Sequence, residues 1–576
     1  MGLARLRVFD ALAACSLLQQ AVALDPKFSL AHSALAEAWS RLGYDKNAKL
    51  EARQAYDLSA NLSREERLLV EGRYRVINHE NDEATDVYRT LFTLFPDNLD
   101  YGLKLAAEQS ASGKGNDALA TIAALHKLAP PASEDARLEW EEAKAWGALS
   151  DFNHQEPTLE RTVEMATAQG SRLILANARE AQCWVFTHLE QEQNAVAACR
   201  EARDIYAATG DHLREAGTLT KWADAIARTD VPESIRLYQQ AQTIDRRNGS
   251  ENGAAVVLNN LGLIYEAQGD LATAERMHRQ SLAGFRLLDD KRYQAVVSGN
   301  IAEDRMEQGD LRGAIQLYEQ ALQLNREDTG NVAFADYGIA NVHQLQGDLE
   351  RAKQGFEESL ALTQKYGDQD WTANAMWSLG NLSLQEADFV GARKMYEQAL
   401  TIRTSAGEKL SIAETQLALA SVSLEKADSP VEQEAMIRQA IEVFQQQKAR
   451  DDEIVAWGLL ARALLAEGRG AAAKEAVQHA RPQAAKSQNP EIRWRTAITA
   501  DRIETAGKNH ARSALQIAAR RELALIAAKS KELGYKGIEL DARLALAEIE
   551  MKAGQTAAGR ARWTRSRRTP RPRGTS

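Results

Sequence analysis

Residues 299–327, GNIAEDRMEQGDLRGAIQLYEQALQLNRE, decide the fold, because a partial copy of them follows soon after in the chain. The copy, residues 338–365, reads GIANVHQLQGDLERAKQGFEESLALTQK. Both stretches contain QGDL, then a small residue, then an aromatic residue four positions later. A sequence that recurs at fixed spacing, with only some letters kept, indicates one structural unit used repeatedly.

The Gly-Asp pair inside QGDL predicts a turn between two helices. Glycine readily adopts the left-handed conformation that ends a helix, and aspartate caps the helix that follows. The turn recurs in steps of 38–41 residues at Gly269, Gly309, Gly347, Ala387, Ala427 and Gly468. Weaker copies stand upstream, in steps of 34–40 residues, and downstream, at Gly43, His79, Gly113, Ser150, Glu190, Asp230, Gly507 and Gly554.

Small residues recur at fixed distances from these turns. One lies seven residues before the turn, another five residues after it and a third twelve residues after it, as in Ala302, Ala314 and Ala321. Small side chains let two antiparallel helices approach closely, and larger ones at intermediate spacing fill the space between hairpins. We expect that filling role for Tyr318, Phe356 and Tyr396.

This pattern resembles the tetratricopeptide repeat (TPR), a helix–turn–helix unit with a small-residue signature. The resemblance covers about residues 1–558, and the period of about 34–41 residues is at its longest in the middle of the chain. It implies an all-α protein, a right-handed superhelical solenoid of antiparallel helix hairpins. We expect N-terminal repeats over residues 1–150, central repeats over 151–480, degenerate repeats over 481–558 and a disordered arginine-rich tail over 559–576.

Composition narrows the class of protein. The chain has 576 residues, a net charge of −10 and 44% hydrophobic residues, which is ordinary for a folded protein and offers no positive surface for nucleic acid. No apolar run is long enough to span a membrane, so we expect a cytoplasmic protein; an extracytoplasmic location is the alternative if the chain is detached from a membrane-anchored parent.

The first helices of the hairpins predict a binding face. Stacked hairpins form a superhelix whose concave side is lined by these helices. Asparagine there can hold the backbone of an extended peptide with both a donor and an acceptor, and aromatic residues can anchor its side chains. The alternative is that the asparagines bond neighbouring hairpins to each other. The predicted groove residues are Asn259, Asn260, Asn300, Tyr337, Asn341, Trp377 and Asn381.

No catalytic, cofactor or metal-binding motif occurs in the sequence. Phosphate-binding GxxxxGK[ST] and GxGxxG, zinc-binding HExxH and the nucleophile motif GxSxG are all absent. The ten histidines are scattered, and we interpret His188, His278 and His343 as surface or packing residues. Cys183 and Cys199 are interpreted as packed core thiols, with a bond across one hairpin as the alternative. We therefore expect no enzyme activity, no cofactor and no metal.

A second resemblance concerns function. The runs "LSREERLLVEGRYR" and "KARDDEIVAWGLLARALLAEGR" are similar to the TPR region that follows the catalytic domain of bacterial eukaryotic-type serine/threonine kinases, and to that of related winged-helix regulators. The resemblance implies a scaffold that binds a protein or peptide, as the sensor or docking part of a signalling protein. The alternatives are a truncated or split kinase and the ligand-sensing part of a transcriptional regulator, with the kinase or DNA-binding domain encoded upstream.

The two ends of the chain look unlike the rest. Residues 2–9 resemble the last turns of a hairpin's first helix, so we expect Leu3, Leu6 and Phe9 to be exposed. We also expect either that the chain begins inside something longer or that the missing neighbour of this segment is supplied in another way. The tail GRARWTRSRRTPRPRGTS holds seven arginines and no acidic residue. It is interpreted as a relic of cloning or of a frameshift, or else as an arm for an acidic partner.

Overall fold

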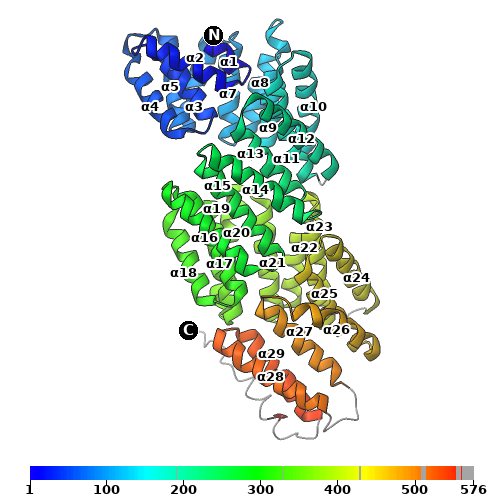
Figure 1. The fold of residues 1–576 in the computed structure, drawn as a ribbon. Helices are drawn as coiled ribbons and strands as arrows, with labels where there is room; N and C mark the ends of the chain where they lie inside the picture. Colours follow the sequence, from blue (N-terminus) through cyan, green and yellow to red (C-terminus); the bar gives the residue numbers. More distant parts are fainter. Residues whose placement is uncertain (190, 327–328, 427–429, 507–513, 553–558, 561–576) are drawn as a thin grey trace, which may run out of the picture. The chain divides into compact units, whose positions relative to one another are not determined.

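The protein is an array of antiparallel helix hairpins, as Figure 1 shows. The computed structural model describes residues 1–576 except 190, 327–328, 427–429, 507–513, 553–558 and 561–576. Within the described residues there are 29 α-helices and no strand, which confirms the predicted all-α, TPR-like solenoid. The expected turns at Glu190, Ala427, Gly507 and Gly554, and the tail from residue 561, lie outside the described residues.

The chain forms two compact units, residues 1–253 and 254–576. The predicted subdivision into three groups of repeats stays a prediction. The helices of the first unit are α1 (Gly2–Arg7), α2 (Ala11–Leu24), α3 (Ser29–Arg41), α4 (Asp45–Asp57), α5 (Arg64–Ile77), α6 (Asn81–Leu94), α7 (Leu99–Ala111), α8 (Gly115–Leu125), α9 (Ala136–Ala148), α10 (Phe152–Ala168), α11 (Arg172–His188), α12 (Glu192–Thr209), α13 (His212–Ala225) and α14 (Val231–Arg247), with 3-10 turns at Ser59–Asn61 and Ala132–Glu134.

Helix α15 (Glu251–Ala267) begins at the boundary between the units. The second unit continues with α16 (Leu271–Leu287), α17 (Lys291–Gln308), α18 (Leu311–Leu324), α19 (Thr329–Gln346), α20 (Leu349–Tyr366), α21 (Gln369–Gln385), α22 (Phe389–Ala406), α23 (Lys409–Lys426), α24 (Pro430–Gln446), α25 (Arg450–Ala466), α26 (Gly470–Ala484), α27 (Pro490–Glu504), α28 (Ala514–Leu533) and α29 (Lys536–Lys552).

Backbone geometry confirms most of the predicted turns. Gly269, Gly309 and Gly347 have φ values of 74°, 94° and 77°, in the left-handed region. The same conformation occurs at predicted turns that lack glycine, His79, Ser150 and Ala387, where it costs free energy because a Cβ is present. The following aspartates cap the next helix: Asp270, Asp310 and Asp348 accept hydrogen bonds from the backbone N–H groups of Thr273, Gly313 and Arg351.

The repeated small residues are buried where the helices of a hairpin meet. Ala302, Ala314 and Ala352 have no exposed surface, and the large side chains Tyr318, Phe356 and Tyr396 are also fully buried. A Cβ added at Gly338 would lie 2.2 Å from the ring of Tyr318, so this position accepts only glycine. The interlocking of large and small residues was predicted from the sequence and is confirmed.

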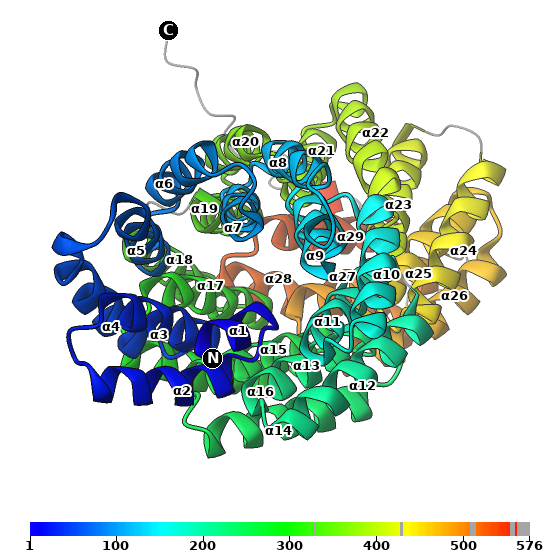
Figure 2. The ribbon, with the colours of Figure 1, turned by 90° about the horizontal axis from the view of Figure 1, so that it is seen from above.

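Odd-numbered helices form the inner layer of each unit. They contact one another between successive hairpins, as α7 does with α9, and α17 with α19. Figure 2 shows this for the first unit, where α7, α9 and α11 lie inside the curve and α8, α10 and α12 lie outside it. The inner side chains of consecutive hairpins therefore come together on one face.

The N-terminal segment of the first unit is packed rather than exposed. Leu3 is 50% exposed, but Leu6 is 4% exposed and Phe9 packs against Ala136, Ala166 and Ile174. The expectation that Leu6 and Phe9 are exposed is therefore wrong, because residues more than a hundred positions away in the chain cover Phe9.

The cysteine interpretation also needs correction. Cys183 on α11 and Cys199 on α12 form a disulfide, with their Cα atoms 5.2 Å apart. The two residues are fully buried and bridge one hairpin, which was the alternative interpretation. Cys15 is a buried free thiol.

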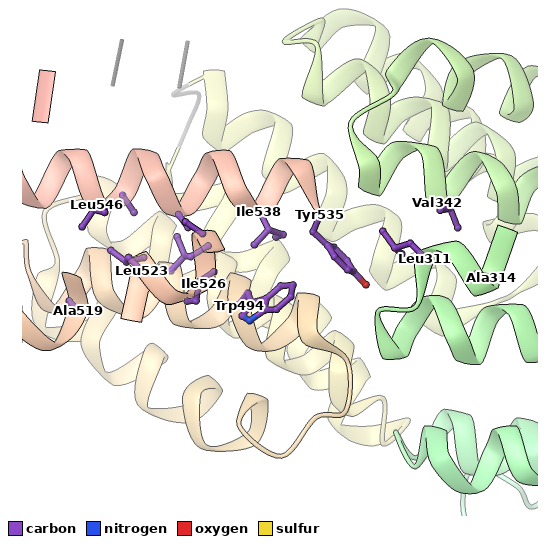
Figure 3. Close-up of a cluster of buried hydrophobic side chains, with 14 of the residues drawn as sticks. Leu311, Ala314, Val342, Trp494, Ala519, Leu523, Ile526, Tyr535, Ile538 and Leu546 are labelled. Atoms are coloured by element: carbon purple, nitrogen blue, oxygen red, sulfur yellow. The ribbon is translucent and has the colours of Figure 1, made fainter. Parts of the chain in front are cut away.

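The second unit closes on itself at its C-terminal end. Helices α27–α29 share one hydrophobic core with α17–α19, in which the Tyr535 ring lies between Trp494 and Leu311 (Figure 3). The Tyr535 hydroxyl donates a hydrogen bond to the backbone carbonyl of Met306, at 3.1 Å, across 229 residues of sequence. Gln488 adds a second link, because its side-chain oxygen accepts a hydrogen bond from the backbone N–H of Ala272 at 3.2 Å.

We predict that this closure carries much of the stability of the second unit. Truncating a buried aromatic residue typically costs about 3–5 kcal/mol, so Tyr535→Ala should lower the free energy of unfolding by that order. Tyr535→Phe removes only the hydrogen bond and should cost about 1 kcal/mol. Urea unfolding followed by circular dichroism measures both changes.

Tyr366→Ala is the matched control, because Tyr366 is 55% exposed at the end of α20. It should change the free energy of unfolding by less than about 0.5 kcal/mol. Equal losses for Tyr535→Ala and Tyr366→Ala would contradict a stabilising closure.

Candidate functional site

The predicted asparagines serve mainly to bond helices together. Asn300 Nδ2 donates to Asn259 Oδ1 at 2.9 Å, which joins α17 to α15. Asn381 Oδ1 accepts from the Tyr396 hydroxyl at 2.7 Å, which joins the two helices of one hairpin. The Asn259–Asn300 bond joins neighbouring hairpins, as in the alternative interpretation, whereas the Asn381 bond lies within one hairpin. Asn260 is partly buried on α15.

The predicted aromatic residues of the inner layer are likewise engaged. The Tyr337 hydroxyl and Ser378 Oγ are 2.8 Å apart, which links α19 to α21, and Asn341 lies beside the same hydroxyl. The Trp377 ring packs in a core with Tyr396, and its buried Nε1 has no hydrogen-bond partner among the described residues. The Arg403 guanidinium lies 6.0 Å from the centre of the Trp377 ring. The role of all seven residues in peptide binding stays a prediction.

A cavity opens beside these residues on the N-terminal side of α19 and α21. It has a volume of about 290 Å³ and is bounded by Asn300, Phe334, Tyr366 and Trp371 among others. The Phe334 and Trp371 rings meet edge to face, with their centres 5.2 Å apart. Ligand pockets usually measure about 300–1,000 Å³, so this cavity suits one side chain of a larger ligand.

Carboxylates gather on the inner face of the second unit. Glu266 on α15 and Glu303 and Glu307 on α17 are partly buried, and none of the three forms an ion pair with any described residue. Asp451 and Asp452 at the start of α25 add further negative charge, and both contribute to raising the pKa of Glu307. We call Glu266, Glu303, Glu307, Asp451 and Asp452 the acidic face.

The acidic face holds its protons more tightly than isolated carboxyl groups do. Burial, helped by the charges of Glu303, Asp451, Asp304 and Asp452, raises the pKa of Glu307 to about 8. Burial and the Asp304 charge raise the pKa of Glu303 to about 7, against the opposing influence of His278. Near neutral pH these groups are therefore partly protonated for want of a positive partner.

A buried contact between a histidine and an aspartate lies behind the acidic face. His278 takes the place in its repeat that Tyr318 takes in the next, and its Nδ1 is 2.7 Å from Asp304 Oδ2 with both side chains fully buried. A Cβ at Gly262 would lie 2.2 Å from His278 Nε2, so glycine makes room for the imidazole. His278 is thus a packing residue, as the sequence predicts, and it fixes Asp304.

The first unit also has an inner carboxylate, Glu37, but there the negative charge is paired with cations. Glu37 on α3 accepts hydrogen bonds from Arg73 Nε at 2.6 Å, Arg41 Nη2 at 2.7 Å and Lys104 Nζ at 3.1 Å. Burial opposes ionisation of Glu37, but Lys104, Arg73 and Arg41 outweigh it and hold the pKa well below its usual range. The inner carboxylate of the first unit has its cations within the chain, whereas the acidic face does not.

The acidic face was not predicted from the sequence. One local signal was present. Glu303 and Glu307 stand four residues apart on one helix, where like charges repel each other. No local sequence pattern indicates that Asp451 and Asp452 approach Glu307, because more than 140 residues separate α25 from α17.

Comparison with known proteins gives one family match. Residues 225–376 match the family described as the MalT-like TPR region. The match spans α15 and α17, and hence Glu266, Glu303 and Glu307, but less than half of the chain. No curated protein matches the chain.

Of the solved structures that resemble the chain over part of its length, two serve as examples. The first is a Signal Transduction ATPase with Numerous Domains (STAND) protein with a tetratricopeptide repeat sensor, from Pyrococcus horikoshii. It is 15% identical, with a TM-score of 0.41, and the similarity covers 64% of this chain and 55% of the STAND protein. The second is BtubC (BKLC) from P. vanneervenii, 20% identical with a TM-score of 0.28, over 42% of this chain and 92% of BtubC.

None of the described helices combines the length and the apolar character needed to cross a bilayer.

The raised pKa of Glu307 predicts how stability depends on pH. Glutamate has a pKa of about 4.3 in an unfolded chain, so between about pH 4.3 and pH 8 the folded state binds the extra proton. Stability of the second unit should therefore fall as the pH rises through this window. Glu307→Gln should raise Tm at pH 8.5 by about 2 °C or more, and by less at pH 5.5. Differential scanning calorimetry at the two pH values measures the difference.

Glu37→Gln in the first unit should have the opposite sign. It leaves Arg73 and Lys104 without their shared anion, and breaking a buried ion pair in this way costs about 3–5 kcal/mol. Chemical denaturation at pH 7 measures the loss. If Glu37→Gln stabilised the protein, or Glu307→Gln destabilised it at pH 8.5, the assignment of paired and unpaired carboxylates would be wrong.

Proposed function

We propose that this chain is a non-catalytic TPR scaffold whose second unit binds a positively charged segment of a partner protein. The proposal takes the chain to be the sensor or docking part of a signalling protein. The observation that carries it is the acidic face, on which neighbouring inner helices present carboxylates without cations beside an aromatic cavity. The match to the MalT-like TPR region over the same helices supports a binding role for this face.

The chemistry of the site favours lysine or arginine in the partner. A cation placed between Glu303 and Glu307 would offset their mutual repulsion and release the proton that burial retains. The rings of Phe334 and Trp371 offer the adjacent cavity a surface that attracts cations through their π-systems. The Tyr337 ring links the cavity to the acidic face. Its centre lies 5.3 Å from that of the Trp371 ring, and burial together with the charge of Glu303 raises the pKa of its hydroxyl.

Repeat architecture explains why a segment rather than a small molecule is the proposed ligand. The acidic groups come from α15, α17 and α25, so they are spread over several helices rather than converging on one atom. An extended segment can present charged side chains at intervals along its length, and repeat proteins bind such segments along their inner faces. Asn260 and Trp377 lie on the same layer of inner helices, and they remain candidates for contacts to the backbone and to the side chains of the segment, respectively.

A random peptide library displayed on phage tests the proposal. Selection against the immobilised chain at pH 8 should enrich sequences with lysine and arginine. The double variant Glu303→Gln/Glu307→Gln should bind the selected peptides at least about tenfold more weakly, because loss of a charged hydrogen-bond partner is worth about 1.5–3 kcal/mol. Fluorescence anisotropy with labelled peptides measures the affinity, which should also fall when the pH is lowered to 6.

Glu319→Gln is the matched control, because Glu319 is exposed on the outer helix α18 of the same hairpin. It removes the same charge and should leave binding unchanged. Selection of peptides without basic residues, or equal weakening by Glu319→Gln and by the double variant, would contradict the proposal.

A further inference from the structure

The first unit contains a histidine and two glutamates that converge between α8 and α9. His126 follows directly after α8, and Glu139 and Glu142 lie three residues apart on one face of α9. In the described part of the chain, His126 Nε2 and one carboxylate oxygen of each glutamate lie within 4.8 Å of one another. Imidazole nitrogen and carboxylate oxygen are the ligands that zinc takes, besides thiolate, from proteins.

The second oxygen of each carboxylate is already occupied. Arg161 on α10 donates from Nε to Glu139 Oε2 at 2.8 Å and from Nη2 to Glu142 Oε1 at 3.4 Å. Trp146 Nε1 also donates to Glu142 Oε1, at 3.4 Å. These bonds orient both glutamates so that Glu139 Oε1 and Glu142 Oε2 point to the imidazole. Outer partners of this kind fix the ligands of metal sites.

The distances to the imidazole differ from those of an ordinary histidine–carboxylate pair. His126 Nε2 lies 3.5 Å from Glu142 Oε2 and 3.9 Å from Glu139 Oε1. The other histidine–carboxylate pairs of the described chain are separated by 2.6–2.9 Å, as in His32–Glu51 and His212–Glu215. His126 therefore faces two carboxylate oxygens at once without bonding to either.

This spacing suits a bridging cation. In a tetrahedral zinc site with bonds of about 2.0–2.1 Å, two ligand atoms are separated by about 3.4 Å. Arg161 balances one of the two carboxylates, so the cluster keeps one net negative charge when His126 is neutral. Glu139 is 9% exposed, which makes an unbalanced charge at this place costly.

We propose that His126, Glu139 and Glu142 bind a divalent transition-metal ion, of which Zn²⁺ is the best fit to one nitrogen and two oxygen ligands. Three protein ligands leave a fourth position for water or for a group from a partner. The ion would tie the end of α8 to the face of α9 and fix the segment between them, residues 126–135. The proposal departs from the expectation of no metal site, because the ligands are thirteen and three residues apart and match no metal motif.

Isothermal titration calorimetry of the full chain with Zn²⁺, after removal of metal with EDTA, tests the proposal. We expect one site that His126→Ala abolishes or weakens. Losing even an outer partner of a metal site costs about 10–100-fold in affinity, so loss of a direct ligand should cost at least that much. Glu142→Gln, which keeps the shape of the side chain, should weaken binding to a similar degree. Co²⁺ substituted for Zn²⁺ should give the visible absorption of a tetrahedral site.

His154→Ala is the matched control, because His154 on α10 is exposed and pairs with a single carboxylate, Asp151, at 2.7 Å. It should leave Zn²⁺ affinity unchanged. Circular dichroism establishes that each variant is folded. Absence of Zn²⁺ binding in the wild-type chain, or equal weakening by His154→Ala and His126→Ala, would overturn the proposal, the latter showing adventitious binding to surface histidines only.

Discussion

Two helices can pack closely only where the side chains at their crossing are small, and the rest of this structure depends on that constraint. Ala302 and Ala314 are fully buried at one such crossing, and the neighbouring Tyr318 fills the gap to the next hairpin. The fit is tight enough that Gly338 and Gly380 accept no Cβ against Tyr318 and Tyr396. Repeating this contact sets the distance between hairpins, and so brings their inner helices into line.

Alignment of the inner helices has different electrostatic results in the two units. In the first, Glu37 meets Arg73 and Lys104 from the next two inner helices, so the stack is cross-linked by charge. In the second, the acidic face brings carboxylates together without cations, and burial and the neighbouring negative charges raise the pKa values of Glu307 and Glu303, which makes their ionisation costly. A protein that retains such a cost offers binding energy to a positively charged partner, because that partner relieves the repulsion.

Closure of the second unit brings the carboxylates of the acidic face together. Tyr535 and Trp494 attach α27–α29 to α17–α19, and α25 contacts α27 directly. The start of α25 is thereby brought near the end of α17, so that Asp451 and Asp452 act on Glu307. An open array of the same hairpins would leave these groups apart.

The repeat pattern by itself determined the hairpins. It located left-handed turns even at His79, Ser150 and Ala387, where no glycine marks them, and it identified the buried small and aromatic positions. These features follow from contacts within a hairpin or between neighbours, so they recur in the sequence with the period of the structure.

Only the tertiary structure decided which inner groups are free to bind. In the folded chain, Asn259, Asn300 and Asn381 form hydrogen bonds between helices, and Cys183 is joined to Cys199. Phe9 is covered by distant residues. Folding also brings α25 close to α17, and His126 close to Glu139 and Glu142. Some of these contacts join residues far apart in the chain, and others depend on the side-chain directions within one packed hairpin. The sequence offered the asparagine bonds and the disulfide only as alternatives, and its repeat pattern gave no sign of the approach of α25 to α17 or of His126 to Glu139 and Glu142.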